Sequence, residues 1–233
     1  MLKYLSKQLL PPIIHDGLSK INRKLLSPLQ TTIGLSSPAE QSLDIYWDDN
    51  MAQLLEKWGE DHVWNEIQMF LWNTEGKVLD VACGTGVTMK MLERYHKLDI
   101  YGCDISDLLI RKAVEKNIPK EKLIICDATK MAAYADNFFD YSYSIGSLEH
   151  FTEQGIKDFI LENFRITNGS AFHMLPVSKS DTDEGWISPY QSYFNNSMKW
   201  WLEKFRRTYP DVNTVKSSWQ DSRSWGFWFV CTK

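Results

Sequence analysis

Hydrophobic residues recur at helical spacing over residues 41–74. Two apolar stripes with steps of three and four residues predict two amphipathic helices there. The stripes consist of Met51, Leu54, Leu55 and Trp58, and then of Val63, Ile67, Phe70 and Leu71. This segment is therefore predicted to be helical, and the pattern that follows it is different.

From Lys77 onward, short apolar runs alternate with amphipathic stretches. The runs KVLDVA (77–82), LDIYGCD (98–104), KLIICD (122–127), NFFDYSYS (137–144) and SAFHMLPV (170–177) predict strands. The stretches VTMKMLERYHK (87–97), SDLLIRKAVEKN (106–117) and QGIKDFILENFRI (154–166) predict helices, with Ser106 as the N-cap of the second. Alternation of this kind indicates a largely parallel sheet with helices on both faces.

Residues 177–209 interrupt the alternation with polar loops, and YFNNSMKWWLEKFRRTY (193–209) predicts one more helix. Residues 213–218 and 225–232 predict an antiparallel hairpin at the sheet edge. The expected fold is α/β: a doubly wound, mostly parallel seven-stranded, Rossmann-like sheet with an antiparallel C-terminal strand and an N-terminal helical extension. We expect a basic extension at 1–40 and one domain at 41–233, with an insert at 177–209.

Composition narrows the class of protein. The 233 residues are 43% hydrophobic, which allows a sizeable core, and a formal charge of −4 argues against a nucleic-acid partner. Four widely spaced cysteines without a CxxC pair indicate free thiols in a reducing compartment. No run reaches the roughly 18 apolar residues of a membrane span. We therefore expect a cytoplasmic protein.

The first 40 residues are basic and partly amphipathic. Lysines and arginines outnumber acids there, and leucines and isoleucines lie among them. Such a segment is typical of a peripheral membrane contact, here through residues 1–30, or of a partner surface. The alternative, which we favour, is an N-terminal helix packed on its own domain.

The stretch VLDVACGTG (78–86) ends the first predicted strand in two glycines. Gly84 would allow a tight backbone turn, and Gly86 would let a ligand lie against the backbone. In a doubly wound sheet, ligands bind at the carboxyl ends of the strands, where the strand order reverses. A nucleotide site is therefore expected here, although GxG alone is a weak signal.

Three aspartates sharpen this expectation. Asp104 ends the second strand, 20 residues after Gly84, where a carboxylate can accept hydrogen bonds from both hydroxyls of a ribose. Asp127 ends the third strand, where it can reach an adenine amino group, and Asp80 lies inside the first. Met89 stands where a dinucleotide fingerprint needs glycine or alanine. Asp80 would suit a ligand with an ammonium and a sulfonium rather than a pyrophosphate. Each aspartate alone would be interpreted as a cap or turn residue, but together, at the ends of successive predicted strands, they indicate a ligand site.

With four motifs in this order, residues 77–176 resemble the class I S-adenosylmethionine-dependent methyltransferases. VLDVACGTG is similar to the first motif of that family, YGCDIS to its ribose-binding acid, ICDAT to its adenine-binding acid, and FFDYSYSIGSLEHF to its fourth-strand segment. FRITNGSAFHM departs from the Pro-Gly turn that usually precedes strand five, and Asn168-Gly169 can supply that turn. The resemblance covers under half of the chain.

The resemblance implies S-adenosylmethionine as cofactor and S-adenosylhomocysteine as product. Asp104 would hold the ribose, Asp127 the adenine, and the turn at Gly84 the methionine moiety. The implied cofactor-binding residues are Asp80, Ala82, Gly84, Thr85, Gly86, Asp104, Ile105, Asp127, Ala128, Ser144, Ile145 and Gly146. No metal is expected, because DTDEG (181–185) lacks the spacing of a calcium loop.

Methyl transfer to a hydroxyl also needs a base. His150 follows the fourth strand and titrates near neutral pH, so it is the catalytic candidate. A structural histidine that orients the turn is an equally weighted alternative. Glu149 is expected to be solvated or to cap the next helix, and His173 to lie in the core.

Aromatic residues outside the common core are candidates for binding the methyl acceptor. We single out Tyr46, Trp47, Trp186, Tyr190 and Tyr193. A satellite core beneath a lid helix is the alternative. The leader LKYLSKQLLPPIIHDGLSKI (2–21) resembles leaders of bacterial methyltransferases that modify surface polysaccharides such as capsule. That resemblance implies a small-molecule acceptor, with O-methylation of a sugar or of a phosphate-linked substituent.

Other functions share some of these motifs. A NAD-dependent Rossmann oxidoreductase would keep the GxG turn and Asp104, but Met89 and Asp80 argue against it. A non-catalytic subunit that binds S-adenosylmethionine would keep the core motifs and lack an acceptor pocket. A nucleic-acid methyltransferase is disfavoured by the charge and by SIGS (144–147) after strand four.

Overall fold

The computed structural model describes residues 43–187 and 191–233. A short 3-10 helix, η2 (Asp44–Trp47), and the helices α2 (Asp49–Leu55) and α3 (Val63–Phe70) precede the sheet. The strands of the main sheet are β1 (Gly76–Val81), β2 (Leu98–Asp104), β3 (Leu123–Ile125), β4 (Phe139–Ile145), β5 (Thr167–Ser178), β8 (Asp211–Gln220) and β9 (Ser224–Thr232). The later helices are α4 (Val87–Leu92), α5 (Asp107–Glu115), η3 (Lys120–Lys122), η4 (Leu148–His150), α6 (Glu153–Ile166) and α7 (Met198–Arg206), and β6 (Trp186–Ile187) pairs with β7 (Tyr193–Phe194).

The main sheet has the strand order β3-β2-β1-β4-β5-β9-β8. Neighbouring strands from β3 to β5 run parallel, whereas β9 is antiparallel to both β5 and β8. This confirms the predicted doubly wound sheet and its antiparallel C-terminal strands. The order reverses between β1 and β4, so the carboxyl ends of these two strands flank the switch point where ligands bind in such sheets.

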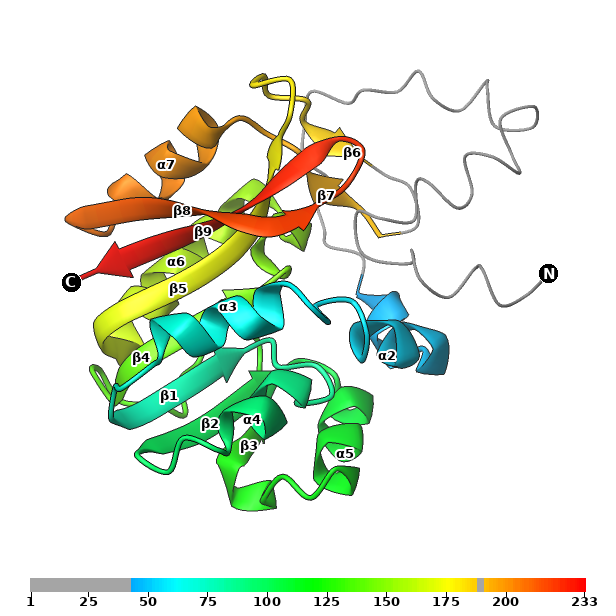
Figure 1. Ribbon diagram of the computed structural model, residues 1–233, viewed down its shortest axis with the longest axis vertical. Coiled ribbons are helices and arrows are strands. Elements are labelled where there is room, and N and C mark those ends of the chain that lie inside the picture. The colour runs from blue at the N-terminus through cyan, green and yellow to red at the C-terminus, as the bar shows by residue number, and fades with distance from the viewer. Residues whose placement is uncertain (1–42, 188–190) are drawn as a thin grey trace.

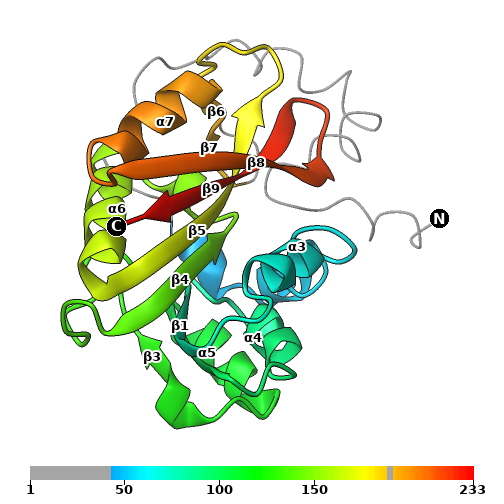
Figure 2. The ribbon, with the colours of Figure 1, turned by 60° about the vertical axis from the view of Figure 1, so that its left-hand side comes forward.

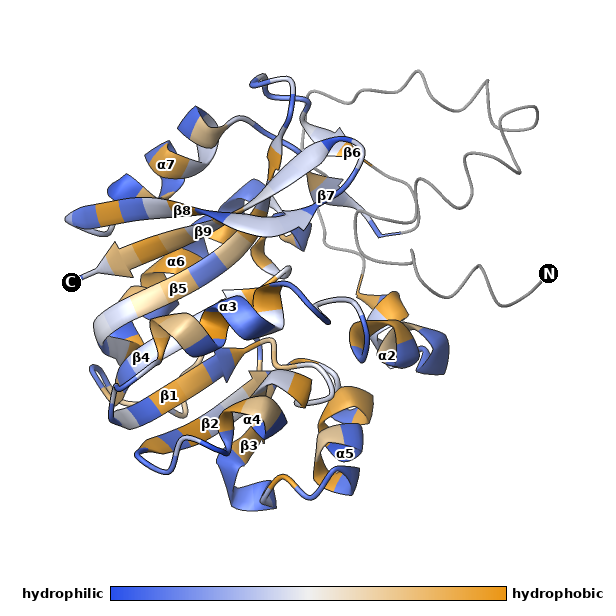
Figure 3. Cartoon of the chain, viewed as in Figure 1, coloured by the Kyte–Doolittle hydropathy of each residue, from blue (hydrophilic) through white to orange (hydrophobic). Residues whose placement is uncertain are grey.

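Helices cover both faces of the sheet. Figures 1 and 2 show α3, α4 and α5 on one face and α6 and α7 on the other. Ile67 of α3 and Trp228 of β9 are buried in the core on the first face, while Phe159, Trp201 and Phe205 fill the core on the opposite face. In Figure 3 the helices α3, α5 and α7 alternate between hydrophobic and hydrophilic residues, as helices that bury one side require.

Side-chain caps begin three of these helices. The Ser106 hydroxyl oxygen accepts a hydrogen bond from the Leu109 N–H at 3.2 Å, which confirms the predicted N-cap of α5. Thr152 and Ser197 cap α6 and α7 in the same way. Each cap stabilises its helix by about 1 kcal/mol. The Ser106 hydroxyl also donates to the Tyr46 carbonyl oxygen at 2.6 Å and so ties η2 to the start of α5.

Two predicted elements have other boundaries. The helix expected over 193–209 spans Met198–Arg206, because Tyr193–Phe194 pair with β6 as the strand β7. The hydrogen bonds to β6 take up the backbone groups that a longer helix would need. The third strand ends at Ile125, so Asp127 lies in the loop beyond it rather than in the strand.

The link between α6 and β5 also differs from the expectation. Helix α6 ends at Ile166 and β5 begins at the next residue, so Asn168 and Gly169 form no turn. They lie in a bulge, where β5 holds one residue more than β4 opposite it. A side chain at Gly169 would come within 2.7 Å of the Asp140 carbonyl oxygen, so the glycine permits a close approach of two strands.

The predicted basic extension, residues 1–40, lies outside the described residues. Among the residues that the structure describes, no helix is long and apolar enough to cross a lipid bilayer. All four cysteines are described, and each is a free thiol, as the spacing predicts.

Candidate active site

A pocket opens at the carboxyl ends of β1, β2, β3 and β4. Its empty space, including the part open to solvent, is about 960 Å³, within the size range of small-molecule sites. Of the twelve residues expected to bind a cofactor, all except Gly86 and Ser144 line it. The switch point of the sheet and the predicted site therefore coincide.

The turn after β1 brings the backbone to the pocket. Ala82 and Gly84 have positive φ angles of 58° and 55°. A side chain at Gly84 would point into the pocket, where its nearest neighbour is the Leu55 Cδ1 at 3.6 Å. A side chain at Gly86 would instead meet the Ile118 Cδ1 at 2.2 Å. The expected roles are thus reversed: Gly84 leaves room for a ligand, and Gly86 lets the start of α4 pack against its neighbours.

Asp104, at the end of β2, holds this turn in place. Its Oδ2 accepts from the Gly84 N–H and its Oδ1 from the Ser106 N–H, both at 2.9 Å. Burial raises the pKa of Asp104 to about 6, although these backbone donors oppose the shift. The carboxylate therefore joins the ends of β1 and β2 directly at the pocket wall.

Asp80 and Asp127 supply two further carboxyl groups. Asp80 is buried and accepts a hydrogen bond from the Tyr143 hydroxyl at 2.8 Å. Burial raises its pKa well above the ordinary value, against the effect of that hydrogen bond. Asp127 is exposed, and its Oδ1 accepts from the N–H and the hydroxyl of Thr129 at 2.8 and 2.7 Å. The three acids lie within, at the end of and just after three adjacent strands, β1, β2 and β3.

The charge of the lining is one-sided. Asp80, Asp104 and Asp127 line the pocket, and no lysine, arginine or histidine does so among the described residues. Carboxylates in a partly desolvated wall attract a cation and repel an anion more strongly than they would in water. The lining thus favours a ligand with positive charge.

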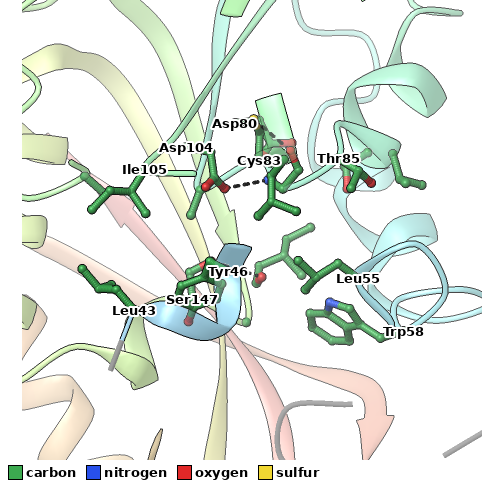
Figure 4. A pocket seen from close by; sticks show the side chains of 18 of the residues that line it. Leu43, Tyr46, Leu55, Trp58, Asp80, Cys83, Thr85, Asp104, Ile105 and Ser147 are labelled. Atoms are coloured by element: carbon green, nitrogen blue, oxygen red, sulfur yellow. Dashed lines mark hydrogen bonds between the residues drawn. The ribbon is translucent and has the colours of Figure 1, made fainter. Parts of the chain in front are cut away.

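The opposite wall comes from segments before β1 and from the insert. In Figure 4, Asp104 and Thr85 lie along one side, while Leu43, Tyr46, Leu55 and Trp58 face them from the other. Twelve further residues line the pocket that the sequence analysis did not predict as ligand contacts: Leu43, Leu55, Trp58, Trp64, Cys83, Val87, Thr88, Leu109, Cys126, Ser147, Phe151 and Gln191. Of these, Leu55 and Trp58 belong to a predicted apolar stripe, which indicates burial, and nothing in the sequence told which positions would face a cavity.

The aromatic candidates divide between two environments. Tyr46 lines the pocket, and its hydroxyl accepts a hydrogen bond from the Gln191 side chain at 2.8 Å. Trp47 is 44% exposed and donates to the first residue of α5. Trp186 packs edge-on against β7, and Tyr193 is fully buried behind the wall. Tyr190 lies outside the described residues.

Ser144 belongs to the core rather than to the pocket. Its hydroxyl lies 2.9 Å from the His173 Nδ1, and both residues are fully buried. His173 packs between aromatic rings, and burial lowers its pKa, so its predicted core position is confirmed. The residues after Ser144, Ile145 and Gly146, form the wall at the end of β4.

Glu149 and His150 lie one layer behind that wall. Both are buried, which contradicts the expectation that Glu149 is solvated, and Thr152 caps α6 in its place. The His150 Nδ1 lies 2.7 Å from the Ser192 carbonyl oxygen, so Nδ1 carries the proton and Nε2 presents a lone pair. Burial lowers the pKa of His150 to about 4 and raises the pKa of Glu149 to about 8. At neutral pH the histidine is neutral and the carboxyl is protonated.

The central part of the chain is similar to a known family of protein domains. Residues 78–169 match the family of methyltransferase domains. The matched segment, 92 of the 233 residues, is similar to that family. The chain is 30% identical over 114 residues to the O-methyltransferase rstn1 of Aspergillus nomiae. That match spans 47% of this chain and 51% of the relative, about half the length of the curated protein.

Solved structures share the fold of this chain. A protein from Pyrococcus horikoshii OT3 has a TM-score of 0.58 and 23% identity, and the match covers 82% of this chain and 95% of that one. The 1,6-didemethyltoxoflavin-N1-methyltransferase of Burkholderia thailandensis, solved with bound 1,6-didemethyltoxoflavin and S-adenosylhomocysteine, has a TM-score of 0.60 and 11% identity. That match covers 80% of each chain. At these identities the likeness shows the fold alone.

Proposed function

We propose that this protein is an S-adenosylmethionine-dependent methyltransferase that acts on a small molecule. The charge of the pocket carries the proposal: three carboxyl groups line it, and no cationic side chain does so among the described residues. S-adenosylmethionine bears a sulfonium and an ammonium, so the acids attract it. A dinucleotide bears a pyrophosphate, which the same acids repel. The charge therefore supports this cofactor over NAD.

The lining residues fit the cofactor group by group. Asp104 would hold the ribose hydroxyls, and Asp127 would reach the adenine. Asp80 would offset the charge of the ammonium, and the turn at Gly84 leaves space for the methionine moiety. The buried hydroxyl of Thr85 has no hydrogen-bond partner among the described atoms, so it would be free to donate to the methionine carboxylate. A burial cost of this kind is ordinarily offset by a ligand or by water.

The residues of the chain contribute alignment and proton transfer. When bound, S-adenosylmethionine supplies an electrophilic methyl group on a sulfonium. Gly146 and Trp58 close the wall around the reacting groups, and alignment of reactants can contribute roughly 7–11 kcal/mol. His150, the predicted catalytic base, does not line the pocket, and its buried Nε2 lies behind the wall, so a role in taking the proton of an acceptor hydroxyl stays a prediction. A positioned base increases the rate of such a reaction by about 10²–10⁴-fold.

For the acceptor, the proposal is a hydroxyl group of a small molecule. The similarity to an O-methyltransferase supports oxygen as the methylated atom. Tyr46 and Trp58 offer ring faces that suit a sugar, in keeping with a role in surface-polysaccharide or capsule biosynthesis. The lack of cations in the described lining favours a neutral sugar over a phosphate-linked substituent.

Other parts of the proposal concern partners and place. We propose that the protein has no nucleic-acid partner and that it is cytoplasmic. The free thiols support the cytoplasmic location. We also propose a peripheral membrane contact through residues 1–30, which lie outside the described residues. A non-catalytic cofactor-binding subunit is disfavoured by the aromatic wall opposite the strand ends, which gives an acceptor a surface to bind.

Calorimetric titration of S-adenosylmethionine and S-adenosylhomocysteine into the purified protein tests the proposal. We expect micromolar binding that Asp104→Asn weakens at least tenfold, because one charged acceptor is lost, which is worth about 1.5–3 kcal/mol. Asp99→Asn is the matched control, since Asp99 lies at the other end of β2 and bonds to Lys122. Thermal unfolding of both variants checks that they fold. Binding of NADH in place of either ligand would reject the proposal.

A further inference from the structure

A tyrosine behind the pocket wall is bonded to the carboxyl group inside β1. Asp80 of β1 and Tyr143 of β4 are register partners in the parallel sheet, and the Tyr143 hydroxyl donates to the Asp80 Oδ2 at 2.8 Å. The Tyr143 side chain is fully buried, whereas Asp80 lines the pocket. The hydrogen bond therefore joins the two strands that flank the switch point, where ligands bind in such sheets.

This hydrogen bond occupies only one oxygen of the carboxyl group. Among the residues that the structure describes, Tyr143 alone donates a hydrogen bond to the Asp80 side chain. An ionised carboxyl group has two acceptor oxygens, so the Asp80 Oδ1 can accept from a further donor. Because Asp80 is part of the pocket lining, a ligand in the pocket can supply that donor.

The electrostatics of the pair favour a cationic donor. Burial and the neighbouring Asp104 raise the pKa of Asp80, and the hydrogen bond from Tyr143 lowers it. Burial raises the pKa of Tyr143 well above its ordinary value, so the hydroxyl keeps its proton and remains a donor. A positive charge on the ligand acts in the same direction as the tyrosine, because an opposite charge stabilises the carboxylate. Tyr143 and a bound cation thus both oppose the cost of ionising Asp80 in this wall.

Resting on the proposed function, we infer that Tyr143 is a positioning residue for the cofactor, because it orients the Asp80 carboxylate so that Oδ1 binds the ammonium of the methionine moiety. Tyr143 contacts the carboxyl group rather than the cofactor, so it acts through Asp80. The ammonium supplies the donor that Oδ1 lacks among the described residues. Charge-assisted hydrogen bonds of this kind are about twice as strong as neutral ones. The pair therefore selects ligands that carry an amino group.

Calorimetric titration with two ligands that differ in one group tests this inference. The ligands are S-adenosylhomocysteine and its desamino analogue, in which a hydrogen atom replaces the ammonium and the carboxylate is kept. The wild type should bind S-adenosylhomocysteine about tenfold more tightly than the analogue, because the analogue cannot donate to Asp80. In Tyr143→Phe this preference should fall about fivefold, while the affinity for the analogue stays within about twofold of the wild type.

Tyr141→Phe is the matched control for this variant. Tyr141 lies two residues earlier on β4 and belongs to the same core cluster as Tyr143, and it has no described hydrogen bond to Asp80. The control should therefore keep the wild-type preference for S-adenosylhomocysteine. Thermal unfolding of each variant checks that it folds.

A double-mutant cycle with Asp80→Asn separates positioning from a merely structural role. Asp80→Asn should already remove the preference for the amino group, so adding Tyr143→Phe should not change the preference further. Equal weakening of both ligands in Tyr143→Phe, an unchanged preference in that variant, or a further change in the double variant would overturn the inference. A wild type that binds both ligands equally would overturn it whatever the variants do. Binding of neither ligand to the wild type would reject the proposed function as well, whereas the other outcomes reject the inference alone.

Discussion

Replacing Glu149 by glutamine should stabilise the protein above neutral pH. Glu149 is a buried carboxyl, and burial raises its pKa from 4.5 to about 8. A raised pKa means that the folded state binds the proton more tightly than the unfolded state does. The contribution of this group to stability is therefore complete below pH 4.5 and is lost as the pH rises to about 8.

The magnitude follows from the width of that interval. Each pH unit above 4.5 costs about 1.4 kcal/mol of folding free energy. The loss is thus about 3 kcal/mol at pH 7 and about 5 kcal/mol above pH 8. Glutamine has the shape of the protonated acid and does not titrate. The variant should match the wild type at pH 5 to within about 1 kcal/mol and exceed it by about 3 kcal/mol at pH 7.

Urea unfolding of the two proteins at pH 5, 6, 7 and 8 measures this difference. Taking the difference cancels His150 and every other group that titrates in both proteins. Glu153→Gln, an exposed glutamate at the start of α6, should show no such pH trend. A Glu149→Gln variant that is less stable than the wild type at pH 8 would refute the reasoning. That result would mean that Glu149 is ionised and paired with a protonated His150, whose Nε2 lies 3.7 Å from the Glu149 Oε1.

Two further predictions concern the pocket wall. Gly84→Ala should weaken S-adenosylhomocysteine binding at least tenfold in calorimetry. It should cost only about 1–2 kcal/mol of folding stability, which is the strain of a side chain at a positive φ. Gly86→Ala should cost more stability, because its new methyl group would meet Ile118. Equal losses of stability in the two variants would contradict the assigned roles. Cys126 lines the pocket and should react with iodoacetamide, with S-adenosylhomocysteine slowing the reaction, whereas the buried Cys231 should stay unmodified until the protein unfolds. Mass spectrometry of tryptic peptides reads both sites, and labelling of Cys126 at the same rate with and without ligand would remove it from the cofactor wall.

The parts of the fold that local sequence determines could be predicted. Ser106 begins α5 because a hydroxyl before an apolar stripe caps a helix wherever the helix packs. The strand–helix alternation predicts the parallel sheet for a similar reason. The spacing of apolar residues that marks each strand or helix depends only on residues that are close in sequence. Asp104 was found because it ends a strand at a fixed distance from the glycine turn.

The parts that depend on tertiary neighbours could not be predicted. Gly84 and Gly86 read alike in the sequence, and only the position of Ile118 decides which one faces a ligand. Glu149 looks like any polar residue before a helix, yet it is almost completely buried in η4, on which the strand β7 packs. The same holds for Trp58, whose helical spacing indicates burial but not the cavity that it covers.

The position of β9 has a consequence for how this protein is made. β9 is the last described strand, yet it lies between β5 and the edge strand β8. β5 gains its second neighbour only after the ribosome has synthesised residues 179–232, which are 54 residues. At a synthesis rate of 5–20 residues per second this takes roughly 3–11 s. During that interval the nascent chain presents an unpaired strand edge, which can pair with other chains. The yield of folded protein from a cell is therefore governed by this interval during translation as well as by the stability of the finished sheet.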